Sequence, residues 1–314
     1  MSLTIGVDIG GTKVLGGVVR EDGAVIAQSR RDTPAASPAD TLDRIVEVVA
    51  DLVADHDVEA VGIGAAGWID ASRSTVLFAP NLAWRNEPLR DELARRIKLR
   101  VVVENDANVA AWAEFQYGAA KDADDSMVMF TIGTGIGGGI VLGGELVRGA
   151  HGIAGEFGHV LAVPDGHPCG CGSRGCLEQY ASGKALTRFA QDAIERDFSA
   201  GARLLQVAGG DVTKVTGPMI TEAAMSGDLL ARSAFEQTGR WLGRGLSDIA
   251  QIFDPQVIVV GGGVIEAGDL LLAPARKAYV DRLAQRANLP VAPIIPAAMG
   301  IMAGVCGAAD LARR

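Results

Sequence analysis

A cluster of cysteines lies in the middle of the chain. Cys169, Cys171 and Cys176 fall within one short segment, CGCGSRGC, in which glycines separate the thiols. Such tight spacing does not suit a distributed disulfide framework, whereas glycine-rich turns let thiolates wrap around a small ion. Three thiolates and one imidazole make a closed tetrahedral set without an open coordination position, which indicates structural and not catalytic Zn²⁺.

The fourth zinc ligand has three candidates by spacing, His151, His159 and His167. We favour His159, at the end of the segment EFGH, and keep His167 as the main alternative. Glu156 and Glu178 flank the set and can accept hydrogen bonds from neighbouring sugar hydroxyls. A bound zinc ion would therefore hold both carboxylates in place.

A second polar group, Glu104-Asn105-Asp106, follows the apolar run VVV. Open α/β sheets collect ligands and catalytic groups at the carboxyl ends of their strands. A sugar hydroxyl is a weak nucleophile and needs a carboxylate that accepts its proton as a phosphoryl group arrives, and Asp106 suits this role. The alternative is that Asp106 only serves as the N-cap of the following helix.

The start of the chain contains a glycine turn between two apolar runs, in the segment DIGGTK. Gly10 and Gly11 let backbone N–H groups approach an anion, so the turn can cradle a phosphate. Asp8 can hold Mg²⁺ through water, Thr12 can donate its hydroxyl to phosphate, and Lys13 can supply positive charge or remain a solvated strand residue. The Walker A pattern is absent, and the alternative is an ordinary tight turn.

Two further glycine clusters are candidates for the same nucleotide site. One follows the apolar run MVMFTI, and the other ends the fully apolar run VIVV. Backbone N–H groups in such loops bind anions. The alternative is three unrelated turns in a chain with 41 glycines. The candidate nucleotide-binding residues in these two clusters are Gly133, Thr134, Gly135, Gly261, Gly262 and Gly263.

Two loop residues are further candidates for sugar binding. Gly67 lies in GAAGWID and Asn81 in APNLAW, each after an apolar run. A backbone group of Gly67 and the side chain of Asn81 can hydrogen-bond a hydroxyl, although such residues also serve turn geometry alone.

The elements that must position these residues follow an α/β pattern. A strand, a glycine turn and a second strand are predicted over TIGVDIGGTKVLGGVV, with further strands at AVIAQS, at VEAVGIGAAG and over RVVVE, where the strand ends at Glu104. Helices are predicted from about Asp40 to Ala54, over PLRDELARRI and over DANVAAWAEFQYG. The segment SMVMFTIGTGIGGGIVLGG repeats the opening strand, glycine turn and strand, which indicates two related halves. We place the boundary near residue 108 from the positions of the motifs.

Length, composition and charge limit the number of domains and the kinds of partner. A chain of 314 residues with 48% hydrophobic content is long enough for two domains. A formal net charge of -9 without a long basic run argues against nucleic acid as a partner. The N-terminal residues contain no signal-peptide pattern, and no apolar run is long enough to span a membrane. We therefore expect a soluble, cytoplasmic protein without a membrane partner.

Taken together, the segments DIGGTK, NDAN, TIGTGIGGG, EFGH and CGCGSRGCLE resemble the ROK family of sugar kinases, and its bacterial glucokinases in particular. The resemblance extends over nearly the whole chain. It implies a two-domain actin/hexokinase-like (ribonuclease H-like) ATPase fold of the α/β class with a cleft between the domains. The implied domains are a smaller one over 1–108 and a larger one over 109–296, and the helix over about 297–314 packs back on the first.

The resemblance also implies an activity, the transfer of a phosphoryl group from Mg-ATP to the 6-hydroxyl of glucose. Asp106 would be the catalytic base, and glucose would contact Asn105, Glu156, His159 and Glu178. His159 would also bind Zn²⁺ together with the three cysteines. The phosphate loops would be residues 8–13 and 133–139, and Gly261 to Gly263 would contact the adenosine. A homodimer or homotetramer is also implied.

One departure and several alternatives remain. The family often has proline where this chain has Ala65-Ala66-Gly67, which weakens the role given to Gly67. Other substrates for a kinase are fructose, mannose or N-acetylated amino sugars, and polyphosphate is another donor. ROK repressors carry a helix-turn-helix module ahead of the kinase-like part, and we expect no such module here. A sensor without turnover is disfavoured because Asp106 is present.

Overall fold

The protein was analysed as a computed structural model that describes residues 2–80, 82–286 and 289–314. The chain forms two compact units. Unit 1 consists of Met1–Met129, Gly138–Gly155 and Ala297–Arg314, and unit 2 consists of Phe130–Gly137 and Glu156–Pro296. Unit 1 thus continues past residue 108, where the motifs place a domain boundary, and that boundary stays a prediction.

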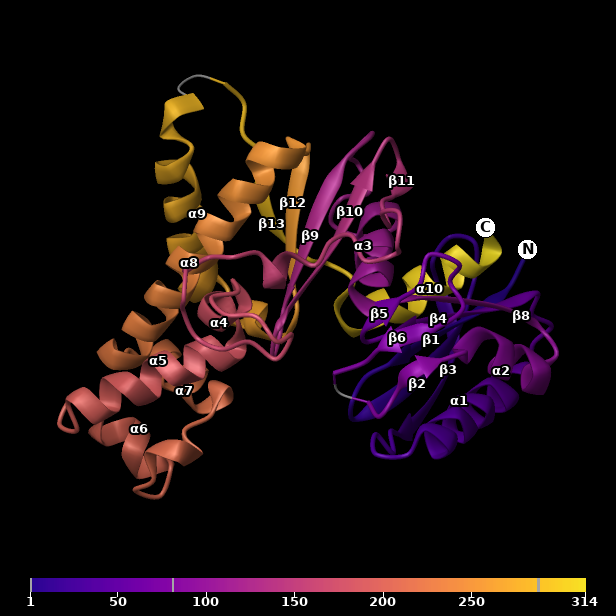
Figure 1. The fold of residues 1–314 in the computed structure, drawn as a ribbon, viewed down its shortest axis with the longest axis horizontal. Helices are drawn as coiled ribbons and strands as arrows, with labels where there is room; N and C mark the ends of the chain where they lie inside the picture. The colour runs from indigo at the N-terminus through magenta and orange to yellow at the C-terminus, as the bar shows by residue number, and fades with distance from the viewer. Residues whose placement is uncertain (1, 81, 287–288) are drawn as a thin grey trace. The chain divides into compact units, whose positions relative to one another are not determined.

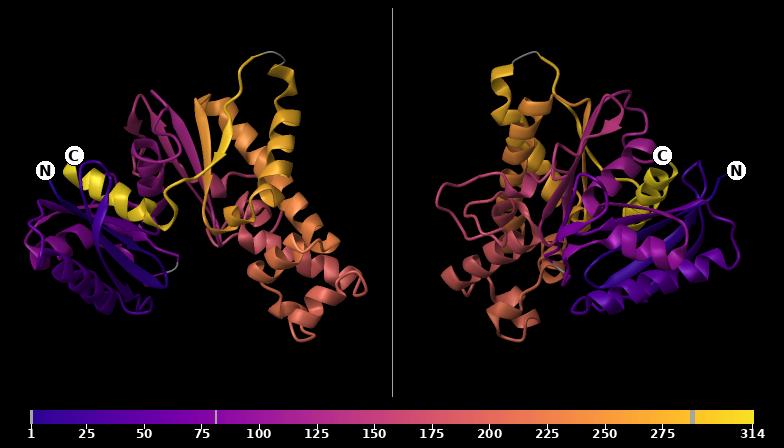
Figure 2. Two further views of the ribbon diagram at one scale, coloured as in Figure 1. Left: turned by 180° about the vertical axis from the view of Figure 1, so that it is seen from behind. Right: turned by 45° about the vertical axis from the view of Figure 1, so that its right-hand side comes forward.

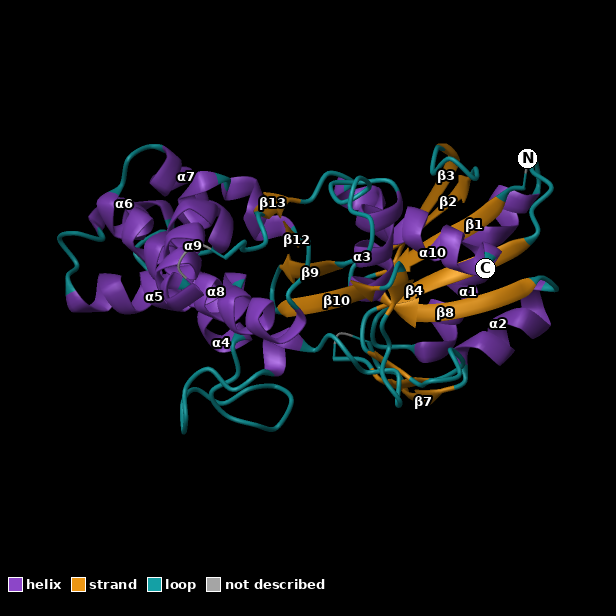
Figure 3. Cartoon of the chain, turned by 90° about the horizontal axis from the view of Figure 1, so that it is seen from above, coloured by secondary structure: helices purple, strands orange, loops and turns teal. Residues whose placement is uncertain are grey.

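Unit 1 is built on a five-stranded sheet with the order β3-β2-β1-β4-β8 (Figure 3). β1 runs antiparallel to β2 and parallel to β4, and β4 runs parallel to β8. The register pairs Asp8 with Gly64 and Gly64 with Glu104. Two acidic residues from distant parts of the sequence therefore lie at the same edge of the sheet. The strands are β1 (Thr4–Ile9), β2 (Lys13–Val19), β3 (Val25–Asp32), β4 (Ala60–Ala65) and β8 (Arg100–Asn105).

Helices cover both faces of this sheet (Figures 1 and 2). The apolar stripe of α1 (Pro38–Val53) packs on alternate β1 residues such as Ile5 and Val7, because successive side chains of a strand point to opposite faces. The hydroxyl of Ser37 caps α1 by accepting a hydrogen bond from the N–H of Asp40. The other helices of unit 1 are α2 (Leu89–Ile97), α3 (Asp106–Gln116) and α10 (Ala303–Arg313).

The C-terminal helix α10 lies on the opposite face of the sheet, against its glycines. A Cβ atom on Gly6 would come within 1.8 Å of the Val305 carbonyl oxygen, and one on Gly62 within 1.8 Å of the Ala308 carbonyl oxygen. Helix and strands therefore approach backbone to backbone. The N-terminal strands and the C-terminal helix form one core, and Figure 2 shows the yellow helix beside the indigo strands.

A small antiparallel sheet, absent from our sequence prediction, lies in the connection between β4 and α2. It consists of β5 (Trp68–Ile69), β6 (Val76–Phe78) and β7 (Arg85–Glu87) in the order β5-β6-β7. The carboxylate of Asp70 accepts hydrogen bonds from the N–H groups of Ser74 and Thr75, each at 2.8 Å, which fixes the turn after β5.

A second five-stranded sheet has the order β11-β10-β9-β12-β13. Both large sheets therefore place their strands third, second, first, fourth and fifth along the chain, in agreement with the repeated strand, glycine turn and strand in the sequence. The strands are β9 (Met127–Ile132), β10 (Ile136–Leu142), β11 (Glu145–Leu146), β12 (Val257–Gly261) and β13 (Ile294–Pro296).

The rest of unit 2 is largely helical (Figure 1). Its α-helices are α4 (Glu178–Ala181), α5 (Gly183–Arg196), α6 (Ala202–Val207), α7 (Gly217–Met225), α8 (Leu229–Phe253) and α9 (Asp269–Arg282). Short 3-10 helices are η1 (Phe157–His159), η2 (Val212–Lys214), η3 (Gly263–Ala267) and η4 (Ala284–Arg286), and η5 (Gly300–Met302) belongs to unit 1. Within the part of the chain that the structure describes, no helix combines the length and apolar character needed to cross a membrane.

Candidate active site

The end of β8 and the start of α3 set the orientation of Asn105 and Asp106. Asn105 is the N-cap of α3, because its Oδ1 accepts hydrogen bonds from the N–H groups of Ala107 at 2.9 Å and Asn108 at 3.0 Å. Asp106 is the first residue of the helix, and its Oδ1 accepts from the N–H of Ala107 at 2.9 Å. The capping role that we considered for Asp106 therefore belongs to Asn105.

Asn105 also joins α3 to the loop at Gly67. Its Nδ2 donates to the Gly67 carbonyl oxygen at 2.9 Å. Gly67 has a φ of 130°, and a Cβ there would come within 2.2 Å of the Phe78 carbonyl oxygen, so no other residue fits without strain. The Asn105 side chain also hydrogen-bonds the carboxylate of Asp106, so it links the Gly67 loop to the candidate base.

Asp8 and Asp106 influence each other within unit 1. Burial raises the pKa of Asp8 to about 6, the negative charge of Asp106 adds to the increase, and Lys13 opposes it. Burial also raises the pKa of Asp106, while hydrogen bonds to its carboxylate lower it in part. A raised pKa makes a carboxylate a stronger base, which suits proton abstraction near neutral pH.

The turn between β1 and β2 is the predicted phosphate loop. The N–H of Gly10 donates to the Lys13 carbonyl oxygen at 3.0 Å, and the Thr33 hydroxyl donates to the Gly10 carbonyl oxygen at 2.9 Å. Gly11 and Thr12 lie at the tip of the turn, and Thr12 is exposed. The loop is thus held at its base while its tip stays accessible.

Glu104 is a buried carboxylate directly before Asn105, and it was missing from our set of binding residues. Its side chain is 1% exposed and lies between two arginines, with Oε2 at 3.0 Å from the Nε of Arg73 and 2.6 Å from the Nε of Arg148. Oε1 accepts from the Asn105 N–H at 3.0 Å and from Asn108 Nδ2 at 3.1 Å. A buried carboxylate with two cationic partners fixes the backbone that presents Asn105.

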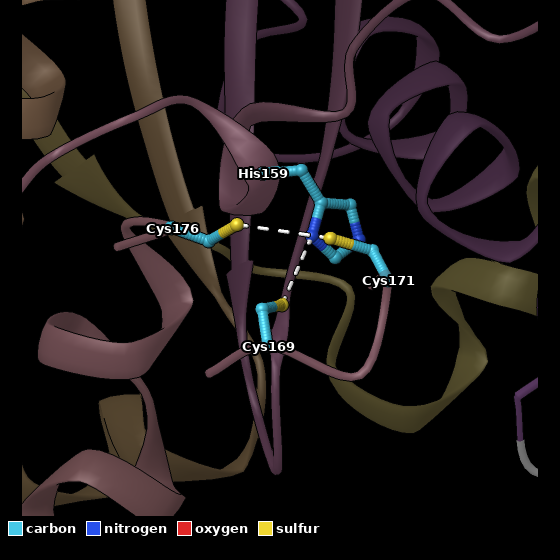
Figure 4. Close-up of side chains that lie close together, drawn as sticks. All are labelled: His159, Cys169, Cys171 and Cys176. Atoms are coloured by element: carbon cyan, nitrogen blue, oxygen red, sulfur yellow. Dashed lines mark hydrogen bonds between the residues drawn. The ribbon is translucent and has the colours of Figure 1, made fainter. Parts of the chain in front are cut away.

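Four potential metal ligands come together in unit 2 (Figure 4). The donor atoms of His159, Cys169, Cys171 and Cys176 all lie within 4.8 Å of one another. His159 Nδ1 is 3.6 Å from the Sγ of Cys169, and the Sγ atoms of Cys171 and Cys176 are 3.7 Å apart. A tetrahedral zinc ion with bonds of about 2.3 Å to sulfur and about 2.0 Å to nitrogen separates sulfurs by about 3.8 Å and sulfur from nitrogen by about 3.5 Å. The cluster therefore fits Zn²⁺.

The other candidate histidines lie outside this cluster. His167 is exposed, and its ring contacts Tyr180 at a centroid distance of 5.5 Å. His151 is exposed in unit 1. His159 directs Nδ1 to the thiols, whereas its Nε2 lies 3.8 Å from Oε2 of Glu156. This arrangement leaves Nε2 available for a partner other than a metal.

Glu178 lies next to the same cluster. Its Oε1 is 3.0 Å from the Sγ of Cys169 and 3.2 Å from Nε2 of Gln179. Burial raises the pKa values of the Cys169 and Cys176 thiols. A cation would stabilise these thiols as thiolates beside the Glu178 carboxylate.

A large pocket lies in unit 2, with a volume of about 900 Å³. Three of the candidate nucleotide residues, Gly133, Thr134 and Gly263, are among its lining residues, whereas Gly135, Gly261 and Gly262 are not. Gly262 has a φ of 91°, and a Cβ there would come within 2.4 Å of the Ile132 carbonyl oxygen, which explains a glycine at that turn. Our sequence analysis missed the lining residues of α5 and α7, which include Lys184, Thr187, Arg188, Gln191, Thr221 and Glu222.

The predicted residues divide between the two units. Unit 1 carries the loop from Asp8 to Lys13 together with Gly67, Asn105 and Asp106. Unit 2 carries Gly133 to Gly135, Gly261 to Gly263, Glu156, Glu178 and the four metal-site residues. Asn81 lies outside the described residues.

A model of the family described as "ROK family" matches residues 4–314. The chain belongs to the ROK family.

Two curated relatives of this ROK protein are bacterial glucokinases. The glucokinase of Streptomyces coelicolor is 47% identical over 313 residues, covering 100% of this chain and 98% of the relative. The glucokinase of Thermotoga maritima is 36% identical and covers 98% of this chain and 96% of the relative. These matches extend over both units.

Among solved structures, a ROK family glucokinase from Streptomyces griseus in complex with glucose and AMPPNP superposes with a TM-score of 0.89 and 49% sequence identity, covering 99% of each chain. The two related sheets of this ROK protein therefore form the actin/hexokinase-like fold that its sequence motifs predict.

Proposed function

We propose that this ROK protein is an ATP-dependent glucokinase that transfers the γ-phosphoryl group of Mg-ATP to the 6-hydroxyl of glucose. The observation that carries the proposal is its similarity over 99% of the chain to a glucokinase solved with glucose and AMPPNP. The placement of Asp106 at the carboxyl end of a buried strand agrees with it.

Asp106 is the general base in this proposal. Its carboxylate accepts the proton of the 6-hydroxyl while that oxygen forms a bond to the γ-phosphorus and the bond between the γ-phosphorus and the leaving oxygen of ADP breaks. Because Asn105 caps α3, Asp106 remains free for this step. Asn105, Gly67 and Asn81 are proposed sugar contacts.

Each unit carries residues proposed to contact the nucleotide. In unit 1, the N–H groups at Gly10 and Gly11, the Thr12 hydroxyl and Lys13 would contact phosphate, and Asp8 would hold Mg²⁺ through water. The raised pKa of Asp8 beside Asp106 indicates a site that favours a cation. Mg²⁺, when bound, neutralises charge that develops on the phosphates.

The pocket of unit 2 is the proposed adenosine site. Its volume of about 900 Å³ suits a ligand of nucleotide size. Gly133, Thr134 and Gly135 would contact the phosphates, and Gly261 to Gly263 would contact the adenosine. Side chains of α5 and α7 form the remaining walls.

Sugar binding in unit 2 would involve Glu156, His159 and Glu178. With Nδ1 on zinc, the Nε2 of His159 carries a hydrogen and can donate to a hydroxyl. A structural Zn²⁺ held by His159 and the three cysteines would keep this donor and both carboxylates in fixed positions. A homodimer or homotetramer also remains part of the proposal.

ADP release from Mg-ATP tests the proposal directly. We would assay the purified protein with glucose, mannose, fructose, N-acetylglucosamine and N-acetylmannosamine at one concentration, and with polyphosphate in place of ATP. Strong turnover with glucose supports the proposal, whereas a preference for another sugar identifies a different ROK kinase. Sugar binding without turnover would instead support a sugar-sensing regulator.

A further inference from the structure

The backbone of Glu178 is anchored by its neighbours. Cys176 is a member of the metal cluster, and Leu177 is 3% exposed. Leu177 packs closely on α8, because a Cβ on Gly245 would come within 2.3 Å of its Cδ2. A close-packed side chain of this kind resists displacement. Glu178 can therefore respond to a change nearby by rotating its side chain more easily than by moving its backbone.

The carboxylate of Glu178 faces Gly135 in the loop between β9 and β10. A Cβ on Gly135 would lie 2.6 Å from Oε2 of Glu178, which is closer than nonbonded atoms approach. Gly135 is not among the residues with positive φ, so its backbone accepts an L-amino acid. Glycine at this position thus provides space for the carboxylate and not a special backbone conformation.

The loop between β9 and β10 also contacts the first residue of α5. The N–H of Gly183, the first residue of α5, donates to the Gly133 carbonyl oxygen at 2.8 Å, and the N–H of Gly133 donates to the Gly135 carbonyl oxygen at 3.0 Å. Residues 133–135 therefore meet the segment 178–183 at both ends. One end reaches the carboxylate beside the metal cluster, and the other reaches the wall of the nucleotide pocket.

We infer that Gly135 is a positioning residue for the sugar, because the absence of a side chain at this position determines where the Glu178 carboxylate lies. The loop proposed to bind phosphate and the carboxylate proposed to bind glucose are then coupled by direct contact. A movement of the loop when phosphate binds would change the space open to Glu178. The inference rests on the proposed function and adds a sugar-side role to a residue of the donor loop.

The variant Gly135→Ala tests this coupling. The added methyl group meets only the flexible end of a side chain, so the protein should fold and melt as the wild type does. Turning Glu178 away from its preferred position should raise the glucose Kd, measured by calorimetry without nucleotide, by about three- to tenfold. The matched control is Gly217→Ala at the start of α7, where an added Cβ meets nothing within 4 Å and glucose affinity should not change.

A double-mutant cycle shows whether the effect passes through Glu178. The substitution Glu178→Asp withdraws the carboxylate by one methylene and leaves room for the methyl group. In that background, Gly135→Ala should change the glucose Kd by less than about 1.5-fold, because residues in contact have non-additive effects. An equal effect in both backgrounds would show that Gly135 acts by another route.

Each outcome separates the inference from the proposed function. If Gly135→Ala binds glucose with wild-type affinity, Gly135 does not position Glu178, although the wild type remains a glucokinase. An equal rise of the Kd in Gly217→Ala would show that the effect is not specific to the contact with Glu178 and would overturn the steric argument. If the wild type itself does not bind glucose, the proposed function fails, and the inference fails with it.

Discussion

Neighbouring side chains at the start of α3 have different tasks. Both polar atoms of the Asn105 amide are hydrogen-bonded. Its Oδ1 accepts N–H groups of α3, and its Nδ2 donates to the Gly67 carbonyl oxygen. The Asp106 carboxylate accepts the N–H of Ala107 and a hydrogen bond from the Asn105 side chain. The neutral Asn105 caps the helix, and the neighbouring Asp106 keeps a carboxylate with a raised pKa, as a general base requires.

The variant Asp106→Asn tests this division of tasks. An amide of the same size cannot accept the proton of the 6-hydroxyl, so kcat should fall by about 10² to 10⁴. Glucose affinity should stay close to that of the wild type, because Asn105 still caps the helix. Single-turnover kinetics together with calorimetry would separate the two effects. Turnover at the wild-type rate would exclude Asp106 as the base.

The burial of Asp8 should make the stability of the protein depend on pH. Its pKa rises from 3.8 to about 6 on folding, so the folded state binds this proton more tightly than the unfolded chain does. The stabilisation is therefore complete below the unfolded pKa and is lost as the pH rises through the folded pKa. We expect this group to lower the free energy of unfolding between about pH 4 and pH 7.

The variant Asp8→Asn cannot ionise, so its free energy of unfolding should not fall in this way as the pH rises. Its melting temperature at pH 7.5, without Mg²⁺, should exceed that of the wild type by roughly 2 °C or more, and the difference should shrink toward pH 4.5. The control is Asp22→Asn, which removes an exposed carboxylate whose pKa is lowered by the N–H of Ala24 and by Arg20. That variant should not melt higher at pH 7.5. Equal melting temperatures for Asp8→Asn and the wild type would contradict the expectation.

At the scale of elements, we expect the loop between η1 and α4 to depend on a metal ion for its order. It contains two short hydrogen-bonded turns, closed at Gly166 and Gly172, and two isolated bridges pair its two halves. Its side chains Val160 and Leu161 are exposed. A loop of this kind cannot bury enough apolar surface to hold one conformation. The four ligands supply the missing constraint.

Cys171→Ser tests this dependence. The variant should lose about one zinc ion per chain by metal analysis and melt at a lower temperature, because metal affinity is coupled to folding. Its KM for glucose should rise, since Glu178 and His159 lose their common support. Cys306→Ser is the matched control, a buried thiol in α10 outside the metal cluster, and it should keep its zinc. Full zinc content in Cys171→Ser would show that the ligand set is wrong.

Local patterns in the sequence predict the parts of the site that depend on neighbouring residues. The apolar run before Glu104 and the helical spacing after it are sufficient to predict β8, α3 and the position of Asp106. The cysteine spacing is sufficient for the metal cluster, and the structure selects His159 among the candidates. Each of these features is encoded within about twenty residues.

Long-range pairings were out of reach of the same reasoning. Arg73 and Arg148 meet Glu104 from segments far apart in the sequence, and single arginines carry no signal of their partners. The walls of the pocket in unit 2 come in part from α5 and α7, whose polar residues look like an ordinary solvated face. The strands β5, β6 and β7 are too short to give a periodic pattern.

At the scale of the whole molecule, unit 1 is assembled from both ends of the chain. Helix α10 lies on β1 and β4 at backbone distance, and Glu114 of α3 accepts the N–H groups of Ala298 and Met299 at 2.7 to 3.0 Å, where the chain returns to unit 1. A Cβ on Gly304 would lie 2.7 Å from the carboxylate carbon of Asp8. The last segment of the chain therefore packs against Asp8, at the end of β1.

The variant Gly62→Ala would disturb the packing of α10 on β4. The new methyl group would overlap the Ala308 carbonyl oxygen at 1.8 Å, and backbone atoms cannot rotate away as a side chain can. Overpacking of this kind costs about 1 to 3 kcal/mol, so we expect unit 1 to melt lower by roughly 5 °C. The control is Gly217→Ala at the start of α7, where a Cβ meets nothing within 4 Å and alanine favours the helix. Hydrogen exchange should show faster exchange in β1, β4 and α10 of Gly62→Ala but not in α8, because the strain belongs to the packing of the C-terminal helix. Uniformly faster exchange in both units would mean that they unfold together and that α10 stabilises the entire chain.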